Sequence, residues 1–391
     1  MMGNRHVFYI GMGTWDGTTS IGMVRIMSVL GKYNDLTFVN YPYTIKDVLL
    51  GIIGLNNFPV SRILGIKNRV EKKKTLQGHY VNVFTSFPLL SINFIKNRNI
   101  YLLMLRVNNW ILRLCLKSYL SKNKIEKPII IYGFNPFSGL FNIGELGESQ
   151  NIYYCYDQIK AAKWLSNHGG DIEEQFIKKV DKVITTSRAL YFEKRKLNHN
   201  CSLIQNGVDF ELFNKAYNPI KEIKSNVSIG YIGMVDDRID YNLLEFLLVS
   251  LPKYQFRMMG KVTNSIEKNK LSKFKNIEFT GHINYEEVTK YLTNLDICII
   301  PFTKNEFTRN IYPNKINEYL AAGKPVISTN FADLREFDNI ISLVNSKEAF
   351  LEALKYEVCN NDQKKQRLRI QTANNNSWEK RGKVLYDFIN S

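Results

Sequence analysis

The sequence predicts an α/β protein with two doubly wound, Rossmann-like parallel-sheet domains. Short apolar runs typical of buried strands alternate with longer mixed runs typical of helices along most of the 391 residues. The polar segment 219–225 interrupts this alternation, and the apolar run 227–235 begins a fresh unit. The length agrees with two or three domains, at roughly 150 residues per domain.

In the first unit, the run 6–12 ends at glycines and the run 21–30 follows it, which predicts a strand, a Gly-rich turn and a helix. The segment 42–78 is hard to place and includes the basic patch 67–74. The run 98–120 predicts a long basic helix. Further strands are predicted at 36–40, 80–85, 128–132, 151–156, 182–186 and 202–205.

The second unit repeats the pattern. Its predicted strands lie at 227–235, 254–259, 276–280, 296–302 and 325–329, and its predicted helices at 240–249, 285–293 and 314–322. A helical run over 377–390 ends the chain. Ligands of such sheets bind at the carboxyl ends of the strands, near helix N-termini, so both units are expected to face a cleft that binds a phosphorylated molecule.

The charge is distributed unevenly. The chain has a net charge of +17, of which residues 1–200 carry +14 and residues 201–391 carry +3. Such asymmetry points to a polyanionic partner of the first half, namely a nucleic acid, an anionic membrane or a phosphate-bearing substrate. No apolar run of 18 residues is free of charge, so we expect no membrane-spanning helix. Five cysteines without a CxxC pair indicate neither a zinc ribbon nor a disulfide framework.

The segment 296–329 carries the strongest chemical signal. A predicted strand ends at Pro301, a polar loop follows, and Pro313 stands at the first turn of a helix. Lys315 and Glu318 are three residues apart and share one face of that helix. Free N–H groups and Lys315 suit a diphosphate, and Glu318 can accept two hydrogen bonds from a ribose diol. A core helix with a surface ion pair is the alternative.

The segment "PNKINEYLAAGKPVIST" resembles the donor-binding region of glycosyltransferases with the GT-B fold, especially the family 4 group and its relatives in bacterial surface-polysaccharide synthesis. Other pieces fall in the family's order. They are "LIQNGVDFELF" (203–213), "IGYIGMVDDRIDYNLLEFL" (229–247), "FRMMGK" (256–261), "NIEFTGHINYEEVTKYLTNLDICIIPF" (276–302), "NNSWEKRGKVL" (375–385) and "NIYYCYDQIKAAKW" (151–164).

The resemblance implies the GT-B fold and its division of labour. Residues 1–205 would form an acceptor-binding domain, residues 206–370 a donor-binding domain, and residues 371–391 a C-terminal helix that crosses back to the first domain. The two domains would close about 206–226 and 370–377.

The resemblance also assigns donor-site residues. Glu318 would hold the ribose, while Lys315 and Asn314 at the helix start and Arg238 would meet the diphosphate. His282 and Ile283 would flank the base, with a surface role for His282 as the alternative. Asn310 stands where family 4 enzymes usually carry the first glutamate of E-x7-E, so retention or inversion of the anomeric configuration stays open.

Two aspartates are candidates for a general base that takes a proton from the acceptor hydroxyl. Asp157 ends a predicted strand, and its alternative role is a helix cap. Asp16 follows the first strand in "GMGTWDGTTSIG", where backbone N–H groups, such as that of Gly13, would turn toward the cleft; its alternative role is a turn residue. Asp16 also occupies the position of the third glycine of a Rossmann fingerprint, which disfavours a nicotinamide cofactor.

The implied function is metal-independent transfer of a hexose from a nucleotide diphosphate sugar, with UDP favoured, to a hydroxyl of a lipid-linked or growing surface glycan (capsule, exopolysaccharide or O-antigen). We expect no cofactor, no metal and no nucleic-acid partner. The helix 98–120 and the patch 67–74 suggest a cytoplasmic protein at the inner face of an anionic membrane, although a core-facing helix is the alternative. A GT-B-fold sugar-nucleotide epimerase, a non-catalytic subunit of a glycan-synthesis complex and, more remotely, a nucleic-acid-binding protein remain open.

Overall fold

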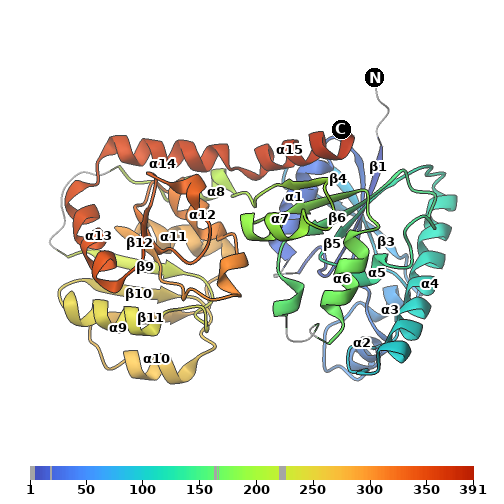
Figure 1. Ribbon diagram of the computed structural model, residues 1–391, viewed down its shortest axis with the longest axis horizontal. Coiled ribbons are helices and arrows are strands. Elements are labelled where there is room, and N and C mark those ends of the chain that lie inside the picture. Colours follow the sequence, from blue (N-terminus) through green and yellow to red (C-terminus); the bar gives the residue numbers. More distant parts are fainter. Residues whose placement is uncertain (1–4, 18–19, 163–164, 166, 220–225) are drawn as a thin grey trace. The chain divides into compact units, whose positions relative to one another are not determined.

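The chain is described by a computed structural model that covers residues 5–17, 20–162, 165, 167–219 and 226–391 (Figure 1). It forms two compact units. Unit 1 extends to Gln205 and also includes Arg381–Ser391, and unit 2 is Asn206–Lys380. Each unit has its own sheet with helices around it, as the sequence predicts.

The sheet of unit 1 has eight strands in the order β3-β4-β2-β1-β5-β6-β7-β8. These are β1 (His6–Gly11), β2 (Asp35–Val39), β3 (Val70–Lys74), β4 (Tyr80–Phe84), β5 (Ile129–Gly133), β6 (Gln150–Cys155), β7 (Lys182–Thr185) and β8 (Cys201–Leu203). All neighbours are parallel except β3 and β4, which are antiparallel. Crossing from β1 to β5 places Val7 opposite Ile129 in the middle of the sheet, where both are buried.

The helices of unit 1 are α1 (Ile21–Leu30), α2 (Ile45–Ile52), α3 (Val60–Ile63), α4 (Arg98–Lys122), α5 (Pro136–Gly139), α6 (Gly169–Ile177) and α7 (Arg188–Lys194), with a short 3-10 turn η2 (Ile159–Ala161). Local signals start several of them. Thr44 and Asp47 form a capping box at α2, and the side chains of Asn97 and Ser187 accept backbone N–H bonds at the starts of α4 and α7.

Helix α4 packs one face into the core of unit 1. Leu105, Leu112 and Leu116 are buried there, so the core-facing alternative holds for this face. The opposite face exposes Trp110 and Leu114. None of the described helices combines the length and the apolar character that crossing a membrane requires.

The sheet of unit 2 has six parallel strands in the order β11-β10-β9-β12-β13-β14. They are β9 (Ser228–Ile232), β10 (Gln255–Met259), β11 (Ile277–Gly281), β12 (Ile297–Ile300), β13 (Val326–Thr329) and β14 (Ser342–Val344). The helices are α8 (Phe210–Asn214), α9 (Tyr241–Ser250), α10 (Ser265–Leu271), α11 (Val288–Thr293), α12 (Asn314–Ala321), α13 (Lys347–Asn360) and α14 (Gln363–Asn375), with 3-10 turns η3 (Tyr285–Glu287), η4 (Thr308–Asn310) and η5 (Arg335–Phe337).

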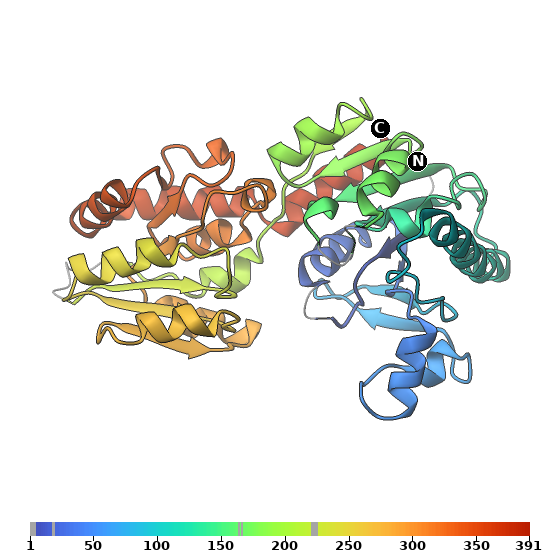
Figure 2. The same cartoon turned by 60° about the horizontal axis from the view of Figure 1, so that its bottom comes forward.

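The last helix, α15 (Trp378–Asn390), returns the chain to unit 1, as expected (Figures 1 and 2). Gly382 packs so closely on α1 that an added Cβ would lie 2.4 Å from the side chain of Val29. The rings of Tyr386 and Tyr33 are 4.9 Å apart. Lys182 Nζ donates to the carbonyl of Phe388 at 2.7 Å, which ties the end of α15 to β7.

Candidate functional site

The start of helix α12 is the centre of the donor site that the sequence predicts in unit 2. Pro313 precedes the helix, and no side chain caps its first N–H groups. The Oδ1 atom of Asn314 is buried and has no hydrogen-bond partner within the described residues. Free N–H groups and a positive helix end are a favourable place for an anion.

Two buried polar side chains fix α12 to its surroundings. The hydroxyl of Tyr319 accepts the backbone N–H of Ile232, at the end of β9, at 2.8 Å. Asn317, fully buried, donates to the hydroxyl of Tyr312 at 2.8 Å and accepts from the side chain of Asn376 at 2.9 Å. These anchors hold the helix start beside the carboxyl end of β9. Contacts between residues so far apart in the chain have no signal in the sequence.

Lys315 and Glu318 lie in the first turns of α12 and are partly buried. The Lys315 ammonium is 5.7 Å from the centroid of the Tyr231 ring. Within the described part of the chain, neither side chain makes a hydrogen bond or a close ion pair. Burial lowers the pKa of Lys315 and raises the pKa of Glu318, while each group favours the charge of the other. A cation and a carboxylate that lack close partners in a desolvated place are suited to partners supplied by a ligand.

Two glycines make room for Lys315. Gly233 follows β9 with φ +153°, and a Cβ there would lie 2.1 Å from Cε of Lys315. Gly260 follows β10 with φ +146°, and a Cβ there would lie 2.0 Å from the carbonyl oxygen of Gly233. Any larger residue at either position would collide with backbone or with Lys315. In the sequence, the only sign of this packing is that a glycine follows each of the strands β9 and β10.

Arg238 is close enough to Lys315 to disfavour its charge, so the structure brings these two predicted residues together. The Arg238 guanidinium donates to the carboxylate of Asp236, from Nε at 2.8 Å and from Nη2 at 2.7 Å. The sequence did not point to this role of Asp236. The guanidinium carbon lies 5.3 Å from the centre of the Phe302 ring. Arg238 is therefore held in one orientation, with its charge partly neutralised.

The remaining predicted donor residues precede α12 in the chain. His282 follows the edge strand β11 and is exposed, and Ile283 is partly buried against the core. Asn310 is buried in η4, where its Nδ2 donates to the carbonyl of Glu306 at 2.8 Å. That bond gives Asn310 a structural role in the loop before α12.

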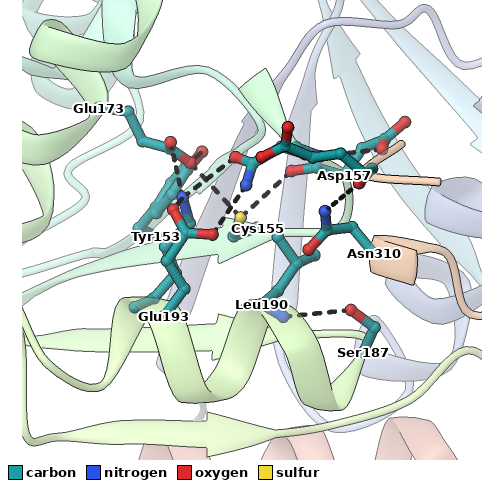
Figure 3. A network of polar contacts seen from close by, with 11 residues as sticks. Tyr153, Cys155, Asp157, Glu173, Ser187, Leu190, Glu193 and Asn310 are labelled. Carbon is teal, nitrogen blue, oxygen red and sulfur yellow. Dashed lines mark hydrogen bonds and ion pairs between the residues drawn. The ribbon is translucent and has the colours of Figure 1, made fainter. Parts of the chain in front are cut away.

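Asp157, the first candidate base, follows β6 in unit 1 (Figure 3). Its side chain is partly buried, and its Oδ1 accepts the backbone N–H of Gln158 at 2.9 Å. This bond to the next residue is not a helix cap, because Gln158 is the residue that precedes η2 and no side chain caps that turn within the described residues. The bond also orients the carboxylate at the carboxyl end of the strand.

A network of hydrogen bonds and ion pairs joins Tyr153, Glu173 and Glu193 near Asp157 (Figure 3). Lys194 Nζ donates to Glu173 at 2.8 Å, to Glu193 at 3.0 Å and to the Gln158 side chain at 3.4 Å. Tyr153 donates to Glu173 at 2.8 Å, and Gln158 donates to Glu193 at 2.7 Å. Burial opposes the charge of Lys194, but its acidic neighbours together raise its pKa above the ordinary value. The network thus fixes the position of Gln158, whose backbone N–H donates to the Asp157 carboxylate.

Asp16, the second candidate base, is in a different environment. Its carboxylate is 72% exposed and lies 3.0 Å from the Lys73 ammonium of β3. The carbonyl of Gly13 accepts the N–H of Tyr41 at 2.9 Å, and a Cβ at Gly13 would lie 2.6 Å from Cβ of Ser20. This loop therefore needs glycine for packing, and Asp16 already has a cationic partner.

Unit 1 also contains a cavity of about 380 Å³ at the carboxyl edge of its sheet. Met12 follows β1, Tyr41 follows β2 and Asn135 follows β5, and all three line it together with α4 residues such as Leu105. Ligands of open α/β sheets bind at this edge. Within the described residues, no group of three or more His, Cys, Asp and Glu side chains is arranged to hold a metal ion.

Part of unit 2 matches a known family model. Residues 226–358 match the family model described as Glycosyl transferases group 1. The teichuronic acid biosynthesis glycosyltransferase TuaH of Bacillus subtilis (strain 168) is 29% identical over 159 residues, which cover 39% of this chain and 38% of TuaH. The chain thus spans less than half the length of this curated relative.

Solved structures with low sequence identity share the fold over nearly the whole chain. A trehalose-6-phosphate protein of E. coli bound with UDP-2-fluoro glucose is 11% identical, with a TM-score of 0.67 and 98% of both chains covered. Anabaena HepE in complex with UDP and glucose is 11% identical, with a TM-score of 0.64, 99% of this chain and 100% of HepE covered. The catalytic domain of Arabidopsis thaliana starch synthase IV, bound to ADP and acarbose, has a TM-score of 0.63, 12% identity and 99% of both chains covered. The chain has the GT-B fold, and its residues 226–358 resemble the group 1 glycosyltransferases.

Proposed function

We propose that this protein transfers a sugar from a nucleoside diphosphate sugar to a hydroxyl of a lipid-linked or growing bacterial surface glycan. The observation that carries the proposal is the pair Lys315 and Glu318, two charged side chains at the start of α12 that have no close partner among the described residues. A diphosphate would accept hydrogen bonds from Lys315 and from the helix N–H groups, and a ribose diol would donate hydrogen bonds to Glu318.

In this mechanism unit 2 stabilises the leaving group. Negative charge grows on the diphosphate as the sugar departs, and the Lys315 ammonium, the Arg238 guanidinium and the α12 N-terminus would offset it. We propose that these groups act without a metal ion. Glu318 fixes the nucleoside, so that binding energy far from the reacting carbon helps to orient the donor.

Unit 1 supplies the acceptor side. Asp157 is the proposed general base, because it is oriented by Gln158 and does not share the exposed ion pair of Asp16. The cavity of about 380 Å³ is the proposed acceptor site. The name of TuaH supports a cell-surface polysaccharide as the product, and a capsule, exopolysaccharide or O-antigen glycan has the same acceptor chemistry.

The donor base is proposed to be uracil, because UDP occurs in the E. coli and Anabaena structures, although starch synthase IV is bound to ADP. The direct test incubates the protein with UDP-, ADP- and GDP-sugars and a membrane lipid extract, and measures the nucleoside diphosphate released. Acceptor-dependent release from one donor, lost in Asp157→Asn, supports the proposal. Conversion of the donor sugar without an acceptor would show an epimerase instead, and no turnover of any donor would contradict transfer.

A further inference from the structure

Exposed apolar side chains are concentrated in one part of unit 1. Most of the large hydrophobic side chains that the described residues expose lie between Ile45 and Leu114. On α4, Leu103, Trp110 and Leu114 are separated by seven and four residues, so they share one face, and they are 57%, 52% and 49% exposed. A set of this kind marks a place where another apolar surface binds.

Part of this surface is a groove of about 580 Å³. One wall is α4, with Trp110 and Leu114, and the other is the segment that leads from α3 into β3. Ile66, which is 78% exposed, and Phe87, which is 48% exposed, complete the apolar lining. Aliphatic chains and an interfacial tryptophan are the side chains that an acyl layer accommodates best.

The charged residues that line this groove are all basic: Lys67, Arg69 and Lys122. The guanidinium of Arg69 lies 3.2 Å from the centroid of the Phe87 ring, and its Nη2 donates to the carbonyl of Ile63 at 3.0 Å. Its Nη1 is buried without a hydrogen-bond partner within the described residues. An oriented cation with a donor left over is complementary to an anionic group.

Two acids on neighbouring elements pair with basic residues that do not line the groove. Glu71 lies 3.0 Å from Arg62, and Glu145 lies 2.7 Å from Arg113. The groove is therefore apolar along its walls and positive at its rim. A base-stacking nucleic-acid surface would need several open aromatic platforms, whereas Phe84 and Tyr119 of this groove are buried and the Phe87 ring is already covered by Arg69.

We propose that this groove docks the protein on a membrane by seating an anionic lipid of the bilayer. The lipid phosphate contacts Lys67, Arg69 and Lys122, and the acyl chain lies along Trp110, Leu114 and Ile66. The inference deepens the proposed function, since a lipid-linked acceptor is presented at a bilayer. Lipid binding can be tested without measuring sugar transfer.

The experiment is co-sedimentation of the full chain with vesicles of phosphatidylcholine, with or without about one third phosphatidylglycerol. We expect binding to the anionic vesicles alone, weakened by about 0.5 M NaCl, which screens surface charge. Each basic residue near the surface is worth about 1 kcal/mol, so Lys67→Gln with Lys122→Gln lowers the partition coefficient by about 30-fold. The matched control, Lys253→Gln with Lys275→Gln, removes the same charge from exposed positions of unit 2 and leaves binding unchanged.

Trp110 provides an independent signal in a Trp164→Phe background, because the two other tryptophans, Trp15 and Trp378, are buried. Anionic vesicles are expected to shift the tryptophan emission to shorter wavelength, and Trp110→Phe removes the shift. The proposal is wrong if neutral vesicles bind equally, if the two lysine pairs behave alike, or if inorganic phosphate alone reproduces the shift. UDP binding, measured on the same samples, separates these failures from a failure of the proposed donor site.

Discussion

Replacing Lys315 with methionine tests two effects of its charge: on the free energy of unfolding of the unliganded protein and on the affinity for UDP. The ammonium has no hydrogen bond within the described residues and lies against Gly233 and the Tyr231 ring. Burial lowers its pKa, which means that the charged form is disfavoured in the folded state. Methionine fills similar space without charge, so the free energy of unfolding of the unliganded variant should not fall.

In the proposed complex with UDP, the same change would remove a charge-assisted hydrogen bond to the diphosphate. Such a bond contributes about 1.5–3 kcal/mol, and its loss weakens UDP binding by about tenfold to 150-fold. Isothermal titration calorimetry measures the affinity, and urea unfolding of the unliganded protein measures stability. Lys253→Met, at an exposed position of the same unit, is the control. Unchanged UDP affinity, or a free protein clearly less stable than the control, would refute the reasoning.

Four further predictions concern the same scaffold. Burial lowers the pKa of His6 to about 4 from an ordinary 6.5, so the unfolded chain binds the extra proton; stability should fall by about 3 kcal/mol between pH 7 and 4 in wild type and not in His6→Gln, as urea unfolding can show. Gly260→Ala should cost about 3 kcal/mol because its Cβ meets a carbonyl oxygen, whereas Gly281→Ala, with φ +78° and open space, should cost about 1 kcal/mol; equal costs would contradict the packing argument. Asp157→Asn should lower the transfer rate by about 100-fold or more while UDP affinity stays constant in calorimetry, and an active variant would exclude Asp157 as the base. Lys194→Met should destabilise the protein by about 3–5 kcal/mol by leaving Glu173 unpaired, and Lys194→Met with Glu173→Leu should recover most of the loss in thermal unfolding.

The sequence was informative where apolar runs are long and unbroken. The central strands β1, β5 and β9 are buried and apolar, and their positions agree with prediction to within a few residues. The strand β3 was missed because its sequence, VEKKK, lacks apolar alternation. It forms at the edge of the sheet, where one face of the charged side chains stays in water. The three-residue strand β14 is too short to carry a pattern.

The site was predictable to the extent that it depends on helix spacing. Lys315 and Glu318 lie together on α12 as their separation requires. Pairings between distant residues carry no such signal. The network of Lys194 with Glu173 joins positions 21 residues apart, and the grip of Asp236 on Arg238 depends on a loop conformation. Such contacts depend on the tertiary structure and therefore cannot be predicted from residue spacing.

The measurement that tests the central claim most directly is calorimetric titration of UDP, ADP and GDP into wild type and Glu318→Ala. We expect wild type to bind one nucleoside diphosphate in preference to the others and the variant to bind it at least tenfold more weakly, because the ribose loses its carboxylate acceptor. Binding of none of the three nucleotides by wild type, or equal binding by both proteins, would contradict the assignment of α12 as the donor site.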